Sequence, residues 1–397
     1  MTEKNPIVIV GAARTPMGGF QGDLKDATAP QLGTVAIDGA LNRSGVAAGD
    51  VDEVIMGVVL PAGMGQAPAR QASRGAGIPD ATGCTTINKM CGSGMKAAML
   101  AHDGILAGSA SVVVAGGMES MSNAPYLLPK ARGGYRLGHG DTVMDHMFLD
   151  GLEDAYDRGK LMGCYAEDTA TKYQFTRDTQ DDFAIESLSR AKKAIEDGSF
   201  KTEVEPVTVK TRKGEVVVKQ DEQPLKANID KIRALKPAFT KDGTVTPANS
   251  SSISDGGAAL VMMRLSEAEN RALTPIAKIH GHTTHAQEPA WFTTAPIGAV
   301  EKLMDKTGWS KDEVDLYEIN EAFAVVTLAA MRDLNLSPDQ VNVHGGACAL
   351  GHPVGASGAR IMVTLMAALE KYNLKKGIAA LCIGGGEATA IAIERMN

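Results

Sequence analysis

Four short segments in the first part of the chain have counterparts in the last part, and the counterparts follow in the same order. Residues 6–10 are similar to 275–279, residues 46–52 to 309–315, residues 91–94 to 355–358, and residues 112–117 to 379–385. The units of a solenoid recur roughly every 20–50 residues, so this much longer period indicates one large duplication. We expect two similarly folded halves that pack about a pseudo-twofold axis.

Each half alternates apolar, β-branched runs with helical patterns. The first half predicts a strand at 6–10, a helix near 30–45, a buried strand at 54–59, a helix ending near 107 and a strand at 111–115. Such alternation is typical of crossover units and favours largely parallel sheets. The predicted domains are a first half of residues 1–120 plus 248–270, an inserted loop or lid domain of 121–247, and a second half of 271–397.

The inserted residues carry weaker periodicity than the halves. We expect a long functional loop at 121–165, whose part 121–145 suits subunit contacts, then an amphipathic helix at 178–197 and a hairpin at 204–219. Residues 226–241 contain five Lys/Arg and one Asp in a chain of net charge −7. This local positive charge is either a solvated face or a binding site for a polyphosphate.

The composition argues against several classes of protein. Acidic and basic residues are mixed along the chain without a basic stripe, so nucleic acid is not expected as a partner. No apolar run reaches the ~18 residues of a membrane span, and a strand pattern begins without a charged-then-apolar leader. The five cysteines are scattered without any CxxC spacing, which predicts no disulfide framework, no metal site and a cytoplasmic protein.

Cys91 stands between a short β-prone run, residues 85–87, and an alanine- and methionine-rich helical pattern. This predicts a strand-to-helix elbow, where the unpaired N–H groups of the helix N-terminus favour a thiolate and can bind an oxyanion. Gly92 and Gly94 have no Cβ, so another backbone or a substrate can approach closely. The alternative is a buried structural cysteine beside a glycine turn.

Three clusters in the second half place polar side chains where regular elements end. Asn320 follows the strand pattern 316–319, and Cys382 precedes three glycines at the end of another strand pattern. His352 precedes a proline in a glycine-rich loop, so irregular backbone presents its imidazole. Alone, the Asn320 cluster is also consistent with an ordinary helix cap.

The duplication adds a geometric argument to these clusters. If the halves pack about a pseudo-twofold axis, the elbow at Cys91 faces the matching elbow at Gly355. His352 lies just before that second elbow, and Cys382 ends the strand that follows it. We therefore expect Cys91, His352, Cys382 and Asn320 to converge on one cleft.

Five ordered blocks resemble the signature blocks of the thiolases: residues 88–97, 249–251 with 255–259, 320–324, 351–353 and 382–386. The opening run 14–18 matches as well, so the resemblance covers essentially the whole chain. Residues 147–152 and Met162-Gly163 are most similar to the acetyl-CoA acetyltransferases of that family. The resemblance implies an α/β fold of duplicated αβαβα layers with an inserted lid, and a homo-oligomer, with a tetramer favoured over a dimer.

The resemblance also implies a reaction. The family joins two acetyl-CoA into acetoacetyl-CoA and coenzyme A, or splits a 3-ketoacyl-CoA in reverse, with the thioesters as substrates and no separate cofactor. By this resemblance Cys91 carries the acetyl group, His352 takes its proton, and Cys382 exchanges a proton with the second acetyl-CoA. One oxyanion binds His352 and a water held by Asn320, and the other binds the N–H groups of Cys91 and Gly384.

Further positions match residues that contact coenzyme A or the acyl chain in the family: Ser251, Phe239, Ala322, Phe323, Met162 and Phe292. Leu161 stands where short-chain members often have histidine, and Phe292 where they often have methionine, so the preferred acyl-chain length stays open.

An arginine that holds the nucleotide phosphates in relatives is missing, with Pro224 near its place, and Lys231, Arg233 or Lys236 is the expected substitute. We interpret His344 and the remaining cysteines as structural.

Four alternatives differ in chemistry. A 3-ketoacyl-CoA thiolase of fatty-acid degradation accepts longer chains, a decarboxylating condensing enzyme releases carbon dioxide, a thioesterase hydrolyses the acyl-enzyme, and a non-catalytic acyl-CoA or lipid carrier forms no acyl-enzyme. Condensing enzymes of this fold usually pair the nucleophile with two histidines, or with a histidine and an asparagine. Cys382 in Cys-x-Gly-Gly-Gly therefore favours a thiolase.

Overall fold

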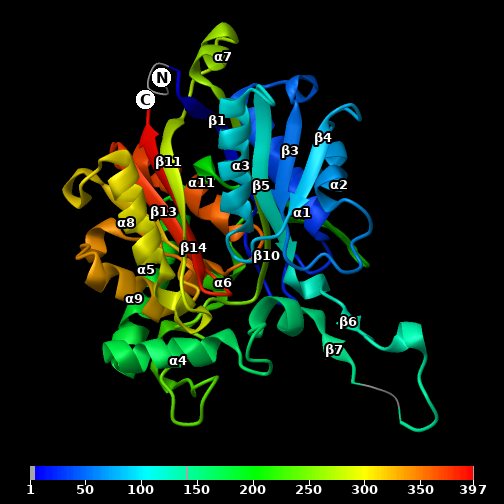
Figure 1. The fold of residues 1–397 in the computed structure, drawn as a ribbon, viewed down its shortest axis with the longest axis vertical. Coiled ribbons are helices and arrows are strands. Elements are labelled where there is room, and N and C mark those ends of the chain that lie inside the picture. Colours follow the sequence, from blue (N-terminus) through cyan, green and yellow to red (C-terminus); the bar gives the residue numbers. More distant parts are fainter. Residues whose placement is uncertain (1–4, 140–141, 397) are drawn as a thin grey trace.

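The computed structural model describes residues 5–139 and 142–396, and Figure 1 shows their fold. One sheet runs through both halves in the order β12-β13-β14-β11-β1-β10-β5-β3-β4, with β2 beside β10. Its strands are β1 (Ile7–Arg14), β2 (Gly18–Gly19), β3 (Glu53–Gly57), β4 (Gly83–Ile87), β5 (Val112–Ser120), β10 (Ser254–Arg264), β11 (Ala277–Ala286), β12 (Leu316–Ile319), β13 (Lys376–Ile383) and β14 (Glu387–Arg395). Residues 140 and 141, inside the loop expected to make subunit contacts, lie outside the described residues.

The strand order shows the duplication directly. The sequence β1-β10-β5-β3 in the first half corresponds to β11-β14-β13-β12 in the second. β1 and β11 pair antiparallel, with Val8 opposite Lys278, so equivalent strands of the two halves meet at the middle of the sheet. The predicted duplication is therefore confirmed.

The prediction of largely parallel sheets is wrong. Among the described strands only β3–β4, β3–β5 and β12–β13 pair in parallel, whereas β1, β10, β11 and β14 form antiparallel ladders. β13 returns directly into β14 through the glycine turn 384–386, in which Gly385 and Gly386 have φ of 92° and 88°. Helical crossovers explain the parallel pairs, but alternation alone does not reveal a strand that returns through a turn or through an insertion.

Two helices lie between the halves and carry the two elbows. α3 (Ser93–Ala107) follows Cys91, and α11 (Ser357–Lys371) follows Gly355. A Cβ on Gly94 would lie 2.8 Å from Ala359 N, and one on Gly358 would lie 2.4 Å from Met95 N. The helices therefore approach so closely that only glycine fits at both positions, and the two elbows face each other as expected.

The remaining helices of the halves cover the outer faces of the sheet. α1 (Ala29–Ser44) and α2 (Pro68–Gly75) pack on the first half, and α8 (Ala295–Thr307) packs on β11, β13 and β14. Alternate residues of β1 enter different apolar clusters, with Ile7 and Ile9 facing α3 and α11 and Val8 and Val10 facing α1. The strands of each half form one layer, and α3 and α11 pack between these two layers. The order of layers is therefore helix, sheet, helix, sheet and helix, as predicted.

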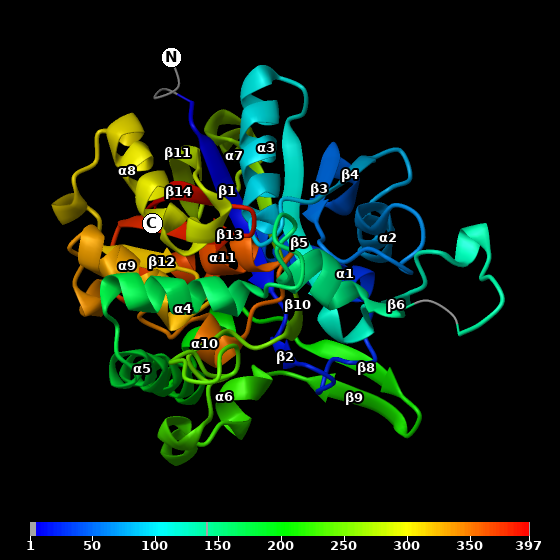
Figure 2. The same cartoon turned by 60° about the horizontal axis from the view of Figure 1, so that its bottom comes forward.

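The inserted residues form the side of the molecule that faces the viewer at the bottom of Figure 2. Their elements are β6 (Tyr126–Leu127), β7 (Met144–Asp145), the π-helix η5 (Phe148–Leu152), α4 (Met162–Tyr173), α5 (Arg177–Glu196), β8 (Val207–Thr211), β9 (Gly214–Val218), α6 (Glu222–Lys226) and the 3₁₀ helix η7 (Ile229–Ala234). The predicted helix and hairpin are confirmed as α5 and β8–β9. α4 was not predicted, because no side chain caps its start and Gly163 weakens the helical pattern.

α7 (Leu265–Asn270) follows β10 in the first half, and α9 (Ala324–Asp333) and α10 (Ala347–Leu350) belong to the second half. Within the described residues, no helix is both long and apolar enough to cross a membrane.

Candidate active site

The elbow between β4 and α3 holds Cys91 by short-range hydrogen bonds. Met90 has a positive φ of 47°, and its N–H donates to Asn88 Oδ1 at 2.8 Å. Ser93 Oγ accepts the Lys89 N–H at 2.8 Å and donates to the Met90 carbonyl at 2.6 Å. These contacts fix the turn that presents the thiol at the start of the helix.

Two backbone N–H groups, those of Gly384 and of Cys91 itself, hydrogen bond to Cys91 Sγ. Burial nevertheless raises the pKa of the thiol to about 11, and the negative charge of Glu119 adds to the rise. At the elbow, desolvation of the thiol therefore outweighs the two N–H groups that favour a thiolate. The thiol needs a partner that accepts its proton.

Cys382 is fully buried at the end of β13, close enough to Cys91 for their charges to interact. Burial raises its pKa well above the ordinary value, and repulsion from a Cys91 thiolate raises it further. The two sulfur atoms therefore titrate as neighbours, and a charge on one disfavours a charge on the other.

His352 lies in the loop between α10 and α11, where its N–H donates to the Ser252 carbonyl at 3.1 Å. Its Nδ1 is 2.5 Å from Ser357 Oγ and 3.5 Å from Asn320 Nδ2, whereas its buried Nε2 has no hydrogen-bond partner among the described residues. Burial, reinforced by the charge of Arg360, lowers the pKa of His352 to about 3. The imidazole is thus neutral, with one ring nitrogen available for chemistry.

The histidine loop reaches the cysteine elbow through apolar contacts. Val354, two residues after His352, packs in one cluster with Met90 and Cys91. Asn320 sits at the end of β12, beside β13, and its N–H donates to the Ala380 carbonyl at 3.0 Å. The structure thus brings Cys91, Cys382, His352 and Asn320 to one region, together with Gly384.

Four further residues support this region and were not singled out from the sequence. Ser357 contacts His352, and buried Arg360 lies 3.5 Å from both Asn320 Oδ1 and Glu318 Oε2. Glu119 accepts the N–H groups of Val59, Leu60 and Gly355 at 2.8–3.2 Å, and burial raises its pKa to about 7. Burial raises the pKa of Glu318 to about 8.

The aromatic and apolar residues assigned to substrate lie beside Cys382. Met162, Phe239, Phe292, Ala322 and Phe323 share one apolar cluster with the Cys382 side chain. The Phe323 ring stands edge-on to those of Phe239 and Phe292, with centroids 5.9 and 6.5 Å apart. These five residues therefore form one packed wall, which is where an acyl chain or a pantetheine arm is expected to lie.

Ser251 is held at the edge of this wall. Its N–H donates to the Ala322 carbonyl at 3.0 Å. Asn249 fixes the preceding turn, since its Oδ1 accepts the Thr246 N–H at 2.7 Å and its Nδ2 donates to Asp181 Oδ1 at 3.0 Å. Asn249 therefore positions Ser251 through the backbone.

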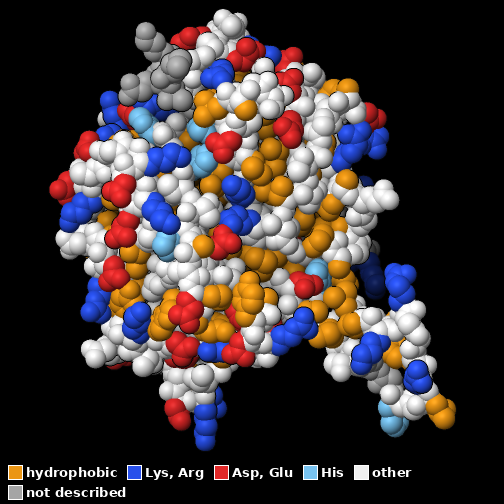
Figure 3. All heavy atoms as spheres, viewed as in Figure 1, with side chains coloured by type: hydrophobic (Ala, Val, Ile, Leu, Met, Phe, Trp, Pro, Cys, Tyr) orange, Lys and Arg blue, Asp and Glu red, His pale blue; other side chains and the backbone are white. Residues whose placement is uncertain are grey.

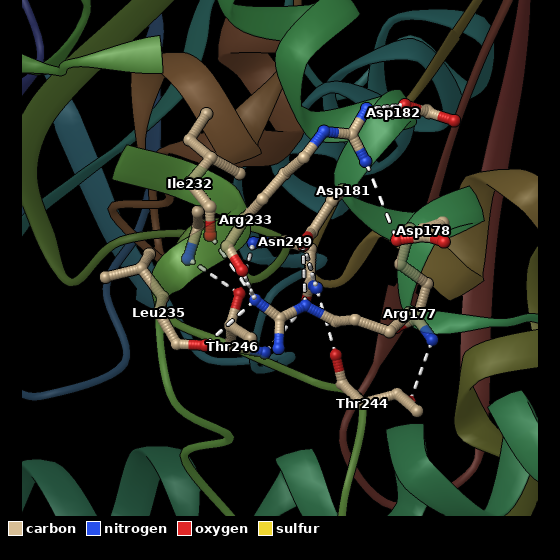
Figure 4. Close-up of polar contacts among 12 residues, drawn as sticks. Arg177, Asp178, Asp181, Asp182, Ile232, Arg233, Leu235, Thr244, Thr246 and Asn249 are labelled. Atoms are coloured by element: carbon tan, nitrogen blue, oxygen red, sulfur yellow. Dashed lines mark hydrogen bonds and ion pairs between the residues drawn. The ribbon is translucent and has the colours of Figure 1, made fainter. Parts of the chain in front are cut away.

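Figure 4 shows how η7, which carries Lys231 and Arg233, is attached to α5. Arg177 pairs with Asp181 at 2.7 Å and donates to the Leu235 carbonyl at 2.9 Å. Arg233 forms ion pairs with Asp182 and, at 3.7 Å, with Asp178. Its guanidinium is already engaged by two carboxylates, which weakens its assignment as a phosphate ligand.

Lys231, in contrast, is exposed at a cavity of about 340 Å³ that Ser252 and Cys348 also line. The predicted structural role of His344 agrees with its burial between Phe200 and Tyr372, whose ring centroids lie 5.8 and 5.6 Å from its own.

Comparison with known proteins covers the whole chain. Residues 7–266 match the family model described as thiolase, N-terminal domain, and residues 273–395 match that of the thiolase C-terminal domain. Acetyl-CoA acetyltransferase 2 of Arabidopsis thaliana is 51% identical over 392 residues, which cover 98% of this chain and 96% of the relative.

Two solved structures are similar over the same extent. The Acat5 thiolase from Ascaris suum in complex with coenzyme A has a TM-score of 0.93 at 44% identity, covering 98% of this chain and all of that one. The acetyl-CoA acetyltransferase of Bacillus anthracis has a TM-score of 0.95 at 42% identity, covering 99% of both chains.

Proposed function

The chain belongs to the thiolase family, and from this premise we propose that it is an acetyl-CoA acetyltransferase acting through an acetyl-cysteine. It condenses two acetyl-CoA into acetoacetyl-CoA and coenzyme A and catalyses the reverse thiolysis. The observation that carries the mechanism is the pair of neighbouring thiols, Cys91 and Cys382, with two N–H groups directed at Cys91 Sγ. A hydrolase or a simple carrier needs only one nucleophile or none.

In the first half-reaction Cys91 Sγ attacks the thioester carbon of acetyl-CoA while His352 Nε2 takes the thiol proton. The new S–C bond forms, the bond to the coenzyme A sulfur breaks, and His352 returns the proton to that sulfur. The pKa values of about 11 for Cys91 and about 3 for His352 make a free thiolate–imidazolium pair rare. Proton transfer must therefore accompany attack, with the developing oxyanion bound by the N–H groups of Cys91 and Gly384.

In the second half-reaction the thiolate form of Cys382 removes a proton from the methyl group of a second acetyl-CoA and becomes a thiol. The resulting carbanion attacks the acetyl carbon, and the bond between that carbon and Cys91 Sγ breaks. Cys91 leaves as a thiolate and takes the proton back from Cys382. An acylated Cys91 carries no charge, so it does not oppose the Cys382 thiolate that this step requires. His352 and a water held by Asn320 bind the enolate oxygen.

The acyl and pantetheine path follows the wall formed by Met162, Phe239, Phe292, Ala322 and Phe323, with Ser251 at its edge. Lys231 or Lys236 is a better candidate for the nucleotide phosphates than Arg233, because the Arg233 guanidinium is paired with Asp182 and Asp178. The substrates are coenzyme A thioesters, and the proposal requires no further cofactor or metal.

We also propose a cytoplasmic homo-oligomer, with a tetramer favoured. The arm that carries β6 and β7 extends away from the body in Figure 1 and exposes Tyr126, Leu128, Tyr135 and Leu137. Exposed apolar side chains of this kind favour contact with another subunit. All five cysteines are free, in accord with a reducing compartment. Light scattering on the full chain measures the number of subunits.

The decisive experiment separates the two half-reactions. Cys382→Ala should still gain an acetyl group on Cys91 from acetyl-CoA, detected by intact mass, yet form acetoacetyl-CoA at least a hundredfold more slowly. Loss of acetylation as well would contradict the assigned roles. A Cys91→Ala chain that still condenses acetyl-CoA would refute the proposed mechanism.

A further inference from the structure

Two histidines and an aspartate outside the active site direct three ligand atoms toward one point. His102 and Asp103 lie in the last part of α3, and His282 lies on β11. Asp103 Oδ1 is 3.0 Å from His102 Nδ1 and 2.9 Å from His282 Nε2, and all three atoms lie within 4.8 Å of one another. A single carboxylate oxygen thus faces both imidazoles.

The surroundings shield the nitrogens and leave one side open. The side chains of His102 and His282 are 13% and 10% exposed, whereas that of Asp103 is 54% exposed. His102 and Asp103 line a cavity of about 600 Å³ together with Lys278, His280 and Lys306. Figure 3 shows histidine, basic and acidic side chains on this face over α3 and β11. Solvent therefore reaches the cluster from the carboxylate side.

The residue types suit a metal ligand set. Imidazole nitrogens and a carboxylate oxygen are ligands that Zn²⁺ takes in proteins, and they do so as neutral imidazole and ionised carboxylate.

A β-bulge in β11 aims His282 at α3. Ile279 pairs with Ile393 and shares the apolar cluster of α3, but the register then shifts past His280. Gly281 therefore pairs with Ala392, on the α8 side, and His282 pairs with Ile391, on the α3 side. If the side chains alternated regularly from Ile279 onward, His282 would point toward α8. β1 has a similar shift after Ile9, so the bulge belongs to the fold and the histidine exploits it.

We propose that His102, Asp103 and His282 bind one divalent transition-metal ion, with Zn²⁺ the best match to two imidazoles and a carboxylate. A tetrahedral ion with bonds of about 2.0–2.2 Å keeps its ligand atoms about 3.4 Å apart. Each ring nitrogen therefore moves a few tenths of an ångström away from Asp103 Oδ1, and the two nitrogens, which lie within 4.8 Å of each other, adjust to the same spacing. Each ring carries its proton on its other nitrogen, and water takes the fourth position. The ion joins α3, which follows the Cys91 elbow, to β11 of the other half.

One nearby charge opposes the ion and provides a test. Lys306 Nζ donates to the His282 carbonyl at 3.0 Å, which places its positive charge beside the cluster. Lys306 makes this hydrogen bond from an exposed position on α8. A neutral side chain at that position should therefore leave the three ligands in place. Lys306→Met should therefore bind the ion several-fold more tightly.

Cobalt is the probe, because Co²⁺ replaces Zn²⁺ in tetrahedral sites and absorbs visible light. The untagged full chain is titrated with Co²⁺, and absorption typical of thiolate-bound cobalt reports any ion held by cysteine instead. We expect one equivalent per chain with a tetrahedral nitrogen–oxygen spectrum, displaced by Zn²⁺. His282→Gln and Asp103→Asn should each weaken binding at least tenfold.

His280→Gln is the matched control, since His280 lies on the same strand and pairs with Glu394 outside the cluster. It should leave the affinity unchanged. Because Asp103 is half-exposed, Asp103→Asn keeps the test valid if His282→Gln does not fold. Absence of stoichiometric cobalt up to millimolar concentration, or equal affinity in Asp103→Asn and the native chain, would overturn the proposal.

Discussion

Replacing Ser357 by alanine should slow the acylation of Cys91 while the fold stays intact. Ser357 Oγ donates its proton to the Pro353 carbonyl at 3.0 Å and lies 2.5 Å from His352 Nδ1. The ring must then donate Nδ1–H to Oγ, which leaves the Nε2 lone pair for the Cys91 proton. In Ser357→Ala the polar neighbour that remains at Nδ1 is the Asn320 amide, itself a donor at 3.5 Å. That neighbour favours the other tautomer, whose Nε2 is protonated and cannot act as a base.

The size of the effect follows from one hydrogen bond in a buried site. A net hydrogen bond contributes about 0.5–1.5 kcal/mol, and a buried donor left without an acceptor costs about 1–3 kcal/mol. If about 1–3 kcal/mol separates the two tautomers, the rate falls roughly 5- to 160-fold, at 1.36 kcal/mol for each factor of ten. Stability should change much less, because the backbone of the second elbow is held by other bonds.

Rapid mixing with acetyl-CoA followed by intact mass measures the acylation rate constant of Cys91 in a single turnover. Ser357→Thr is the matched variant, since it keeps the hydroxyl oxygen and should retain most of the rate. An unchanged rate in folded Ser357→Ala would refute the role of Ser357 in setting the tautomer. Equal slowing in the threonine variant would show that packing, and not the hydrogen bond, is responsible.

Three other perturbations test the packing, the charge and the chain-length boundary. Gly358→Ala should lower the free energy of unfolding, measured in urea, by about 1–3 kcal/mol, because the added Cβ would lie 2.4 Å from Met95 N. Gly104→Ala in α3 is the control. Its Cβ would meet no atom within 4 Å, so the change should be neutral or stabilising. The rate of Cys91 alkylation by iodoacetamide should rise about tenfold per pH unit toward a midpoint near pH 11, since only the thiolate reacts. Glu119→Gln should lower that midpoint, because it removes a negative charge near the thiol. An unchanged midpoint would show that Glu119 does not raise the Cys91 pKa. Phe292→Leu should raise kcat/KM for 3-ketohexanoyl-CoA relative to acetoacetyl-CoA several-fold, as it frees space in the cluster beside Cys382, and a constant ratio would show that Phe292 does not limit the chain.

Much of the fold could be predicted because the repeats identify equivalent strands and helices. The repeats place Cys91 and Gly355 on matching elbows, and the contact between α3 and α11 follows from that equivalence. Strand direction could not be predicted, because it depends on where the chain re-enters the sheet after the insertion. The desolvation of the Cys91 thiol was also beyond the sequence, and it raises the pKa of a side chain that stays half-buried, against the effect of the two N–H groups at the elbow.

Buried charges were missed for a related reason. Glu119 and Glu318 lie in strands, where one acidic residue in an apolar run ordinarily marks an exposed end. Arg360 carried a usable signal, since it lies in a helix whose other residues are apolar on nearly every side, and a helix of that kind is buried. Arg233 shows the opposite error, because a cluster of basic residues says nothing of the acidic residues of α5 that lie beside it in space.

The two elbows share a serine that performs a different task in each half. Cys91-Gly-Ser-Gly and Gly355-Ala-Ser-Gly share a serine, and in both elbows its hydroxyl donates back to a carbonyl, that of Met90 for Ser93 and that of Pro353 for Ser357. The first serine also accepts the Lys89 N–H, whereas the second contacts the His352 ring at the equivalent place. One structural device thus positions the nucleophile in one half and its base in the other. A duplicated chain can therefore assign different chemical roles to equivalent turns without changing the residue that holds them.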